Sequence, residues 1–114
     1  MNEKPNILII CGKNKKRSKT GEHIFRKDPR IDVRSAGVSP KSGKKIGEKD
    51  VSWANLILVM EYDHREKIKE EFSYLRLPKI IVLEIPDEYE FIDKELVEVL
   101  NDKVNSYLKE VFNI

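Results

Sequence analysis

A lone cysteine is followed at a short distance by an arginine and a hydroxyl side chain. Cys11 is the only cysteine in the 114 residues, Arg17 stands six positions later, and Ser18 comes next. A thiolate is a strong nucleophile, and a guanidinium can fork two N–H bonds onto phosphate oxygens. These residue types at this spacing indicate a site in which sulfur attacks a phosphate ester. The competing interpretation is a small buried cysteine at a strand end, with solvated lysines beyond it.

Residues 11–18, which we call the thiol loop, have the surroundings of an anion-binding site. The apolar run at residues 7–10 predicts a buried strand before the loop, and a helix is predicted to begin near Ser18. A loop between a strand end and a helix N-terminus points backbone N–H groups at an anion, and the helix dipole adds to their attraction. The candidate phosphate-binding residues of the loop are Gly12, Lys13, Asn14, Lys15, Lys16 and Ser18.

Two polar side chains of the thiol loop have additional expected roles. Ser18 can donate a hydrogen bond to the Cys11 sulfur, which stabilises the sulfur as nucleophile and later as leaving group. Asn14 tolerates a left-handed backbone conformation and can tie the loop to itself.

A carboxylic acid on a second loop would complete this chemistry. When a thiolate displaces an alkoxide or phenoxide from phosphorus, an acid must protonate the leaving oxygen, and the same group can then activate water. Asp87 is the candidate because a predicted strand precedes it, so it can approach the thiol loop. The alternative is a turn residue after Pro86. Glu88 and Glu90 can also serve, whereas helix capping explains Asp93.

Strands alternating with helices provide the scaffold. Buried-strand patterns cover residues 6–10, 31–34, 56–60 and 79–85, and helical patterns cover residues 18–27, 48–54, 63–72 with Asp63 as cap, and a C-terminal helix capped by Asp93. The core stripe of the last helix is Leu96, Leu100, Val104, Leu108 and Val111. This order indicates an α/β three-layer sandwich, with a four-stranded parallel sheet and helices on both faces. Ligands bind such sheets at the carboxyl ends of the strands.

The composition fits one domain over residues 1–114. Hydrophobic residues make up 39% and charged residues 37%, and the net charge is +2, which gives no indication of a nucleic-acid partner. A single cysteine excludes an intramolecular disulfide and a multi-cysteine zinc site, and it favours a reducing, cytoplasmic location. No stretch approaches the length of a transmembrane helix, so no membrane partner is expected.

The pattern Cys11-x-x-Asn14-x-x-Arg17-Ser18 resembles the signature of the low-molecular-weight protein tyrosine phosphatases. Residues 35–37 (Ser-Ala-Gly), 53–60 and 87–89 (Asp-Glu-Tyr) are similar to further segments of that family, in the same order. The resemblance covers nearly the whole chain and is strongest to a short prokaryotic branch of predicted phosphatases. It implies a four-stranded parallel sheet and catalysis through a phosphocysteine, without metal or cofactor.

By position, the resemblance makes Cys11 the nucleophile, Arg17 the phosphate clamp and Asp87 the general acid. It leaves Tyr89 to stack on a substrate ring. The chain departs from the family pattern at five positions: Lys13 replaces a glycine, Lys16 a second cysteine, Lys19 and Glu88 prolines, and Glu90 a second tyrosine. The aromatic wall beside the site is therefore expected to be thinner.

Three functions remain open from the sequence. The first is a phosphomonoester hydrolase that acts on a phosphotyrosine protein or on a small anionic phosphate ester. The second is an arsenate reductase that uses an external thiol, because the chain has no further cysteine. The third is a catalytically idle phosphate- or phosphoprotein-binding module, which needs Arg17 but not Asp87.

Other charged residues allow weaker expectations. The lysines that can surround the site mouth are Lys13, Lys15, Lys16, Lys19, Lys41, Lys44 and Lys45, and they favour substrates with extra negative charge if they are not simply a solvated surface. Glu61 can brace the thiol loop, although the start of a surface helix explains it equally well. His23 and His64 have no paired ligand that would indicate a metal site.

Overall fold

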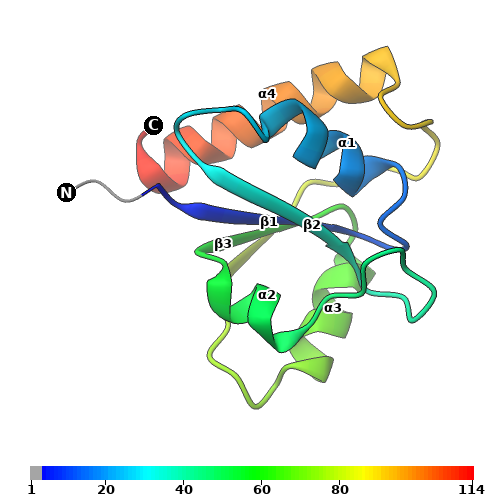
Figure 1. The fold of residues 1–114 in the computed structure, drawn as a ribbon, viewed down its shortest axis with the longest axis vertical. Helices are drawn as coiled ribbons and strands as arrows, with labels where there is room; N and C mark the ends of the chain where they lie inside the picture. The colour runs from blue at the N-terminus through cyan, green and yellow to red at the C-terminus, as the bar shows by residue number, and fades with distance from the viewer. Residues whose placement is uncertain (1–3) are drawn as a thin grey trace.

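The computed structural model describes residues 4–114, so the first three residues of the predicted domain lie outside it. A parallel sheet forms its centre (Figure 1). The strands are β1 (Asn6–Cys11), β2 (Asp32–Gly37), β3 (Leu56–Val59) and β4 (Lys79–Val82). Their order is β2-β1-β3-β4, and all neighbouring pairs are parallel. β1 and β3 are central and read as unbroken aliphatic runs because both of their faces are covered.

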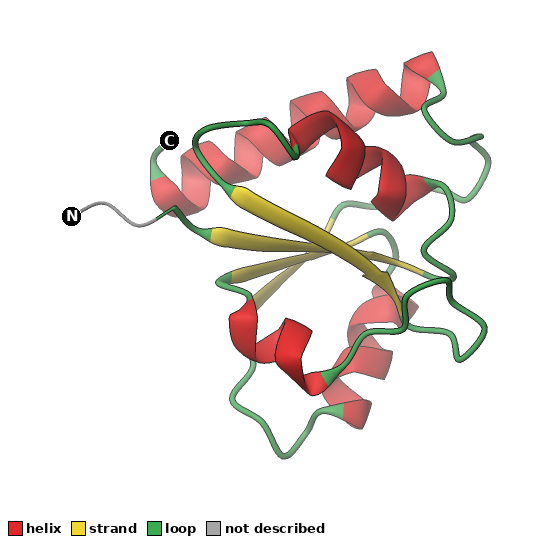
Figure 2. Cartoon of the chain, in the orientation of Figure 1, coloured by secondary structure: helices red, strands yellow, loops and turns green. Residues whose placement is uncertain are grey.

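Two helices cover each face of the sheet (Figures 1 and 2). The helices α1 (Arg17–Phe25) and α4 (Lys94–Phe112) lie on one face, and α2 (Glu48–Trp53) and α3 (Tyr62–Glu71) lie on the other. Alternate side chains of β1 supply the two cores: Ile7 and Ile9 pack under α1 and α4, whereas Leu8 packs toward α2 and α3. The predicted three-layer α/β sandwich is confirmed.

Two strands end three residues away from their predicted ends, and the ends of the other two differ by one residue. Residues 35–37 do not follow β2 but form its end, where Gly37 pairs with Cys11. β4 stops at Val82 instead of residue 85, because Glu84 adopts a left-handed φ of 56° that breaks the pleat. Ile85 still donates its N–H to Met60 O at 3.0 Å, so the chain stays beside the sheet. Asp87 therefore follows an irregular stretch and not the strand directly.

The N-cap residue predicted for α3, Asp63, is wrong. Glu61 is the N-cap residue, with extended backbone, and Asp63 lies within the first turn. An acidic side chain in that turn still suits the helix dipole. The helix at the thiol loop begins at Arg17, one residue before the predicted Ser18, and ends at Phe25.

The C-terminal helix follows its predicted pattern. Asp93 is the N-cap of α4, and its side chain accepts the N–H of Glu95 at 2.9 Å. Leu96, Leu100, Val104 and Leu108 are fully buried, and Val111 is half-buried. Within residues 4–114, no helix combines the length and the apolar character needed to cross a membrane.

Candidate active site

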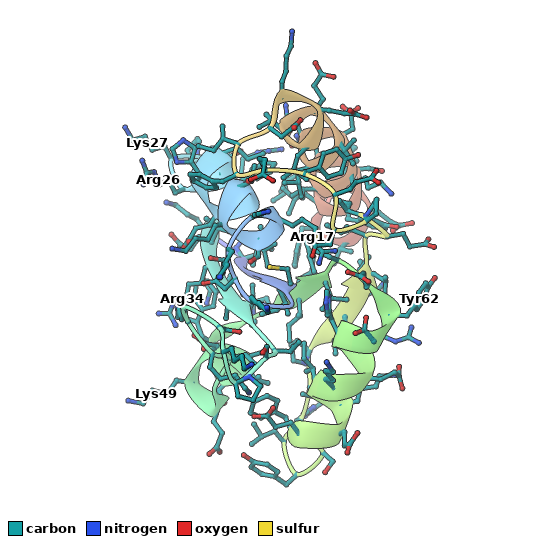
Figure 3. All side chains as sticks on the ribbon, turned by 90° about the vertical axis from the view of Figure 1, so that its right-hand side faces the viewer. Arg17, Arg26, Lys27, Arg34, Lys49 and Tyr62 are labelled. Carbon is teal, nitrogen blue, oxygen red and sulfur yellow. The ribbon has the colours of Figure 1, made fainter. Side chains whose placement is uncertain are left out.

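A cleft of about 570 Å³ opens at the carboxyl ends of the central strands. The connections from β1 and β3 leave there toward opposite edges of the sheet, which is where ligands bind in open α/β folds. Figure 3 looks at this side of the molecule, with Arg17 near its middle. The cleft is lined by Cys11, Gly12, Lys13, Lys15, Lys16, Arg17, Val38, Ser39, Glu61, Asp63, His64, Lys67 and Asp87. The predicted thiol, guanidinium and carboxyl groups thus share one cleft.

The backbone of the thiol loop keeps its donors free and uses its acceptors. The N–H groups of residues 12–16 donate to no acceptor within the described part of the chain. The carbonyl of Gly12 accepts the N–H of Ser39 at 2.9 Å, and the carbonyl of Lys13 accepts that of Gly43 at 3.2 Å. Free N–H groups ahead of a helix N-terminus form an anion-binding nest. The loop after β2 therefore holds the carbonyl side of the thiol loop and leaves its donors for a ligand.

A chain of buried hydrogen bonds holds the sulfur in place. Cys11 Sγ lies 2.9 Å from Ser18 Oγ, and Asn14 Nδ2 donates to Ser18 Oγ at 2.9 Å and to Ser35 Oγ at 3.0 Å. Ser35 donates in turn to Glu22 at 2.7 Å. Because Ser18 Oγ already accepts from Asn14, its own hydrogen is free to point at the sulfur. Asn14 adopts a left-handed φ of 55°, as its residue type suggested.

Gly37 explains why β2 ends in a Ser-Ala-Gly segment. A Cβ placed on Gly37 would lie 2.8 Å from the carbonyl oxygen of Gly12, closer than such atoms approach. Ser35, two residues earlier, lies on the bond network of Asn14. Ser35 therefore supplies a hydrogen-bond acceptor for Asn14, and the missing side chain of Gly37 leaves room for the Gly12 carbonyl of the thiol loop.

Arg17 is buried, with one edge of its guanidinium occupied. Nη1 donates to Glu61 Oε2 at 2.6 Å and to Ile85 O at 2.7 Å, which uses both of its hydrogens. Nε and Nη2 donate to no acceptor among residues 4–114, and Nε lies 3.8 Å from Asp87 Oδ1. The free Nε–Nη2 edge is the one that binds two phosphate oxygens at once. Glu61 and the Ile85 carbonyl thus hold the side chain while leaving this edge to a ligand.

The acid loop, residues 83–92, presents Asp87 to the cleft but not Tyr89. The Asp87 side chain is 68% exposed and lies on the guanidinium side of the cleft. Tyr89, predicted to stack on a substrate ring, instead packs half-buried against the core under α1 and α4 and lines no part of the cleft. Glu90 forms an ion pair with Lys16 at 3.0 Å, which links the two loops.

The predicted lysine ring is only partly present. Lys13, Lys15 and Lys16 line the cleft, together with Lys67, which the sequence did not single out. The other four expected members are engaged elsewhere or lie apart. Lys44 pairs with Asp50 at 3.6 Å, and Lys45 pairs with Glu71 at 2.8 Å. Lys19 lines a separate hollow beside Phe91, and the exposed Lys41 lines no part of the cleft. Lys13 and Lys15 have no carboxylate within 4.0 Å among the described residues.

Sequence reasoning missed His64, which is 4% exposed and lines the cleft. Burial is the main cause that lowers the pKa of its imidazole. The spacing Glu61-x-x-His64 at a helix start was the available signal, because residues at N-cap and N3 can exchange hydrogen bonds. The backbone N–H of Glu61 does donate to His64 Nδ1, at 3.2 Å.

Among the comparisons with known proteins, the solved structures agree on one fold. No protein-family model matches the chain, and no curated protein matches it. Solved structures do match. The tyrosine phosphatase Wzb from Escherichia coli K30, in complex with phosphate, is 24% identical over 96% of this chain and 99% of its own, with a TM-score of 0.72.

Two further solved structures extend this comparison. The low molecular weight protein tyrosine phosphatase SP-PTP from Streptococcus pyogenes is 16% identical over 94% of this chain and 93% of its own, with a TM-score of 0.78. The YwlE arginine phosphatase from Geobacillus stearothermophilus is 20% identical over 94% and 97%, with a TM-score of 0.69. The chain therefore has the fold of the low-molecular-weight protein tyrosine phosphatases, as its sequence pattern predicted.

Proposed function

We propose that the chain is a phosphomonoester hydrolase that works through a phosphocysteine intermediate. One observation carries the proposal: the Cys11 sulfur, residues 12, 13, 15 and 16 with their free N–H groups, and the free edge of Arg17 share one cleft with Asp87. The fold of known phosphatases supports the same conclusion. Because the mechanism needs a free thiol, we place the enzyme in the cytoplasm, a reducing compartment.

In the first step, the Cys11 thiolate attacks phosphorus in line with the leaving oxygen. The S–P bond forms and the P–O bond to the leaving group breaks, while the carboxylic acid of Asp87 gives its proton to that oxygen. The equatorial oxygens take the backbone N–H groups of the thiol loop and the Nε–Nη2 edge of Arg17. Charge that spreads over these oxygens in the transition state therefore meets donors that are already oriented.

In the second step, water replaces the sulfur. The Asp87 carboxylate accepts a proton from water, the new P–O bond forms, and the S–P bond breaks to release inorganic phosphate. Ser18 Oγ, 2.9 Å from Cys11 Sγ, donates a hydrogen bond that stabilises the thiolate as it leaves. The enzyme returns to its starting protonation state once Asp87 is again an acid and Cys11 a thiolate.

The lining of the cleft favours an anionic substrate over a flat aromatic one. Its lining residues include no Phe, Tyr or Trp, and Val38 is their one aliphatic side chain larger than a methyl group. Lys13 and Lys15 supply positive charge with no ion-pair partner in the described chain. We propose a phosphate ester with a second anionic group near the phosphate, since two unpaired lysines attract such a group. The solved tyrosine and arginine phosphatases of this fold differ in substrate, so the fold alone does not select one.

The test of the chemistry is hydrolysis of p-nitrophenyl phosphate with a chelator present. We expect turnover by the native chain, no loss on chelation, and loss of turnover by at least about a thousandfold in Cys11→Ser, because an alcohol at this site is a far weaker nucleophile. Activity that survives Cys11→Ser contradicts the proposal. Phosphate binding without turnover would identify a binding module instead.

The test of the substrate class compares phenyl phosphate with 4-carboxyphenyl phosphate. We expect kcat/KM for the carboxylated ester to fall more steeply with added salt, and the difference to vanish in Lys13→Ala/Lys15→Ala. Lys109→Ala is the matched control, an exposed lysine at the far end of α4. Equal salt dependence of the two esters would refute the anionic preference and leave the phosphatase chemistry untouched.

A further inference from the structure

His64 is a buried group in the cleft that the proposed chemistry does not use. It lies in the first turn of α3, with its side chain 5% exposed. Its Nδ1 accepts the backbone N–H of Glu61 at 3.2 Å, and its own backbone N–H donates to Glu61 O at 3.2 Å. A Cβ placed on Gly12 would lie 3.8 Å from His64 Nε2, so this edge of the ring faces the thiol loop. The ring thus sits between the start of α3 and the first residue after the nucleophile.

The hydrogen bond at Nδ1 determines the tautomer of the ring. A ring nitrogen that accepts an N–H bond carries no proton, so the neutral imidazole holds its hydrogen on Nε2. Burial is the largest cause that lowers the pKa of His64; the nearby cations Arg17 and Lys67 act in the same direction, and the carboxylates Asp63 and Glu61 oppose them. The ring is therefore neutral at neutral pH, and the Nδ1 bond is intact.

We propose that His64 is a positioning residue that fixes Glu61 and, through it, sets the guanidinium of Arg17 for phosphate. The same histidine holds both the N–H and the carbonyl of Glu61. From this anchored backbone the carboxylate reaches Arg17 Nη1 at 2.6 Å. A guanidinium held on its Nη1 side presents its Nε–Nη2 edge in one orientation, which lowers the entropy lost when phosphate binds. The inference rests on the proposed function in that Arg17 binds the phosphate.

Three substitutions of His64 test the roles of its Nδ1 and Nε2 atoms separately. In His64→Asn the side-chain oxygen can take the place of Nδ1 and accept the Glu61 N–H. In His64→Gln the amide reaches the place of Nε2 instead, and His64→Ala has neither group. The readout is the Kd of inorganic phosphate, measured by calorimetry, which needs no turnover. We expect Kd to rise about tenfold in the Ala and Gln variants, since a lost hydrogen bond to a partly buried donor is worth about 1–2 kcal/mol, and to stay within about threefold in Asn.

A double-mutant cycle with Glu61→Gln tests the route of the effect. If His64 acts through Glu61, His64→Ala should weaken phosphate binding far less in the Glu61→Gln background than in the native one. His23→Asn is the matched control, because His23 is an exposed histidine on α1 outside the cleft. Nitrogen chemical shifts of the native ring should identify Nδ1 as unprotonated and Nε2 as protonated.

The outcomes distinguish this inference from the proposed function. Thermal unfolding identifies a variant that does not fold, and the test then rests on the contrast between Asn and whichever of Ala and Gln folds. Native-like phosphate binding in all three variants, or rescue by Gln and not by Asn, would overturn the role of His64 while leaving the phosphatase proposal intact. A native chain that binds phosphate without hydrolysing esters would end the phosphatase proposal and leave this one standing. No phosphate binding by the native chain would overturn both.

Discussion

The thiol loop and the acid loop face each other across one cleft, but they are built in different ways. In the thiol loop, Asn14, Arg17 and Ser18 are all buried and hydrogen-bonded to groups outside the loop or to one another. In the acid loop, Asp87 is two-thirds exposed, and an exposed ion pair links Glu90 to the neighbouring loop. We call the thiol-loop side of the cleft the cradle, and residues 86–90 of the acid loop the arm. Leu83 and Ile85, at the start of the acid loop, are buried, so only the arm is lightly held.

This difference matches what the proposed mechanism requires of each side. Donors that stabilise a transition state must be oriented before the charge develops, because reorienting them during the reaction costs free energy. A carboxyl group that protonates a leaving group and then accepts a proton from water has to approach, exchange its partner and retreat. Buried networks suit the first task and exposed segments suit the second. The comparison therefore predicts that substitutions in the two loops have different signatures.

The largest effect on hydrolysis should come from a substitution in the arm, and that substitution should leave the free energy of unfolding unchanged. We expect Asp87→Asn to lower kcat/KM, which reports the first step, by about 10²–10⁴-fold for esters with poor leaving groups, because no acid remains to protonate the leaving oxygen. For p-nitrophenyl phosphate, whose leaving group needs no proton, the drop in kcat/KM should be much smaller. Steady-state kinetics across a series of phenyl phosphates measures this dependence. A drop of the same size for all leaving groups would mean that Asp87 is not the acid.

Gly37→Ala should have the next largest effect, and it should act on stability and phosphate affinity together. The added methyl would lie 2.8 Å from Gly12 O, so the cradle must shift. Overpacking of this kind destabilises by about 1–3 kcal/mol. Urea unfolding and phosphate calorimetry measure the two effects. Gly47→Ala is the control, because nothing lies within 4 Å of a Cβ placed there. Native-like stability in Gly37→Ala would show that the cradle is not rigid.

The smallest effect should come from loss of the Lys16–Glu90 ion pair, which we call the tether between the loops. We expect Lys16→Ala to change the free energy of unfolding by less than about 1 kcal/mol, since Lys16 and Glu90 are 42% and 82% exposed. If the tether limits the motion of the arm, kcat should change by a few-fold while the Kd of phosphate changes less. Lys103→Ala would be a poor control, because Lys103 Nζ donates to Leu83 O at 2.6 Å. Lys109→Ala serves better. A large loss of stability in Lys16→Ala would contradict the view of the acid loop as lightly held.

The cradle could be predicted from the sequence better than the arm. Cys11, Arg17 and Ser18 lie within eight residues of the chain, at the end of a clear strand and the start of a clear helix, so local pattern places them. Tyr89 was placed in the cleft but packs into the core, because the direction of a side chain in an irregular loop follows from tertiary packing and not from periodicity. The left-handed Glu84, which ends β4 early, has no local signal for the same reason.

The residues that hold Arg17 could not be predicted from the sequence, for a different reason. Its partner Glu61 is 44 positions away and Ile85 is 68 positions away, so only the fold brings them together. Glu61 was recognised as a residue that could brace the thiol loop, but not as the partner of Arg17. His64 was missed because the spacing Glu61-x-x-His64 indicates only a helix start, and the burial of the ring in the cleft follows from the fold.

The central claim is that the Cys11 sulfur becomes phosphorylated during turnover. Asp87→Asn is the variant in which this intermediate should accumulate, since the second step needs a base to activate water. The protein is mixed with p-nitrophenyl phosphate, quenched in acid within the first turnover and analysed by peptide mass spectrometry. We predict one phosphoryl group on the peptide that contains Cys11, and none when Cys11→Ser is added to Asp87→Asn. Product formation by Asp87→Asn with no phosphoryl group on Cys11 at any quench time would contradict the account.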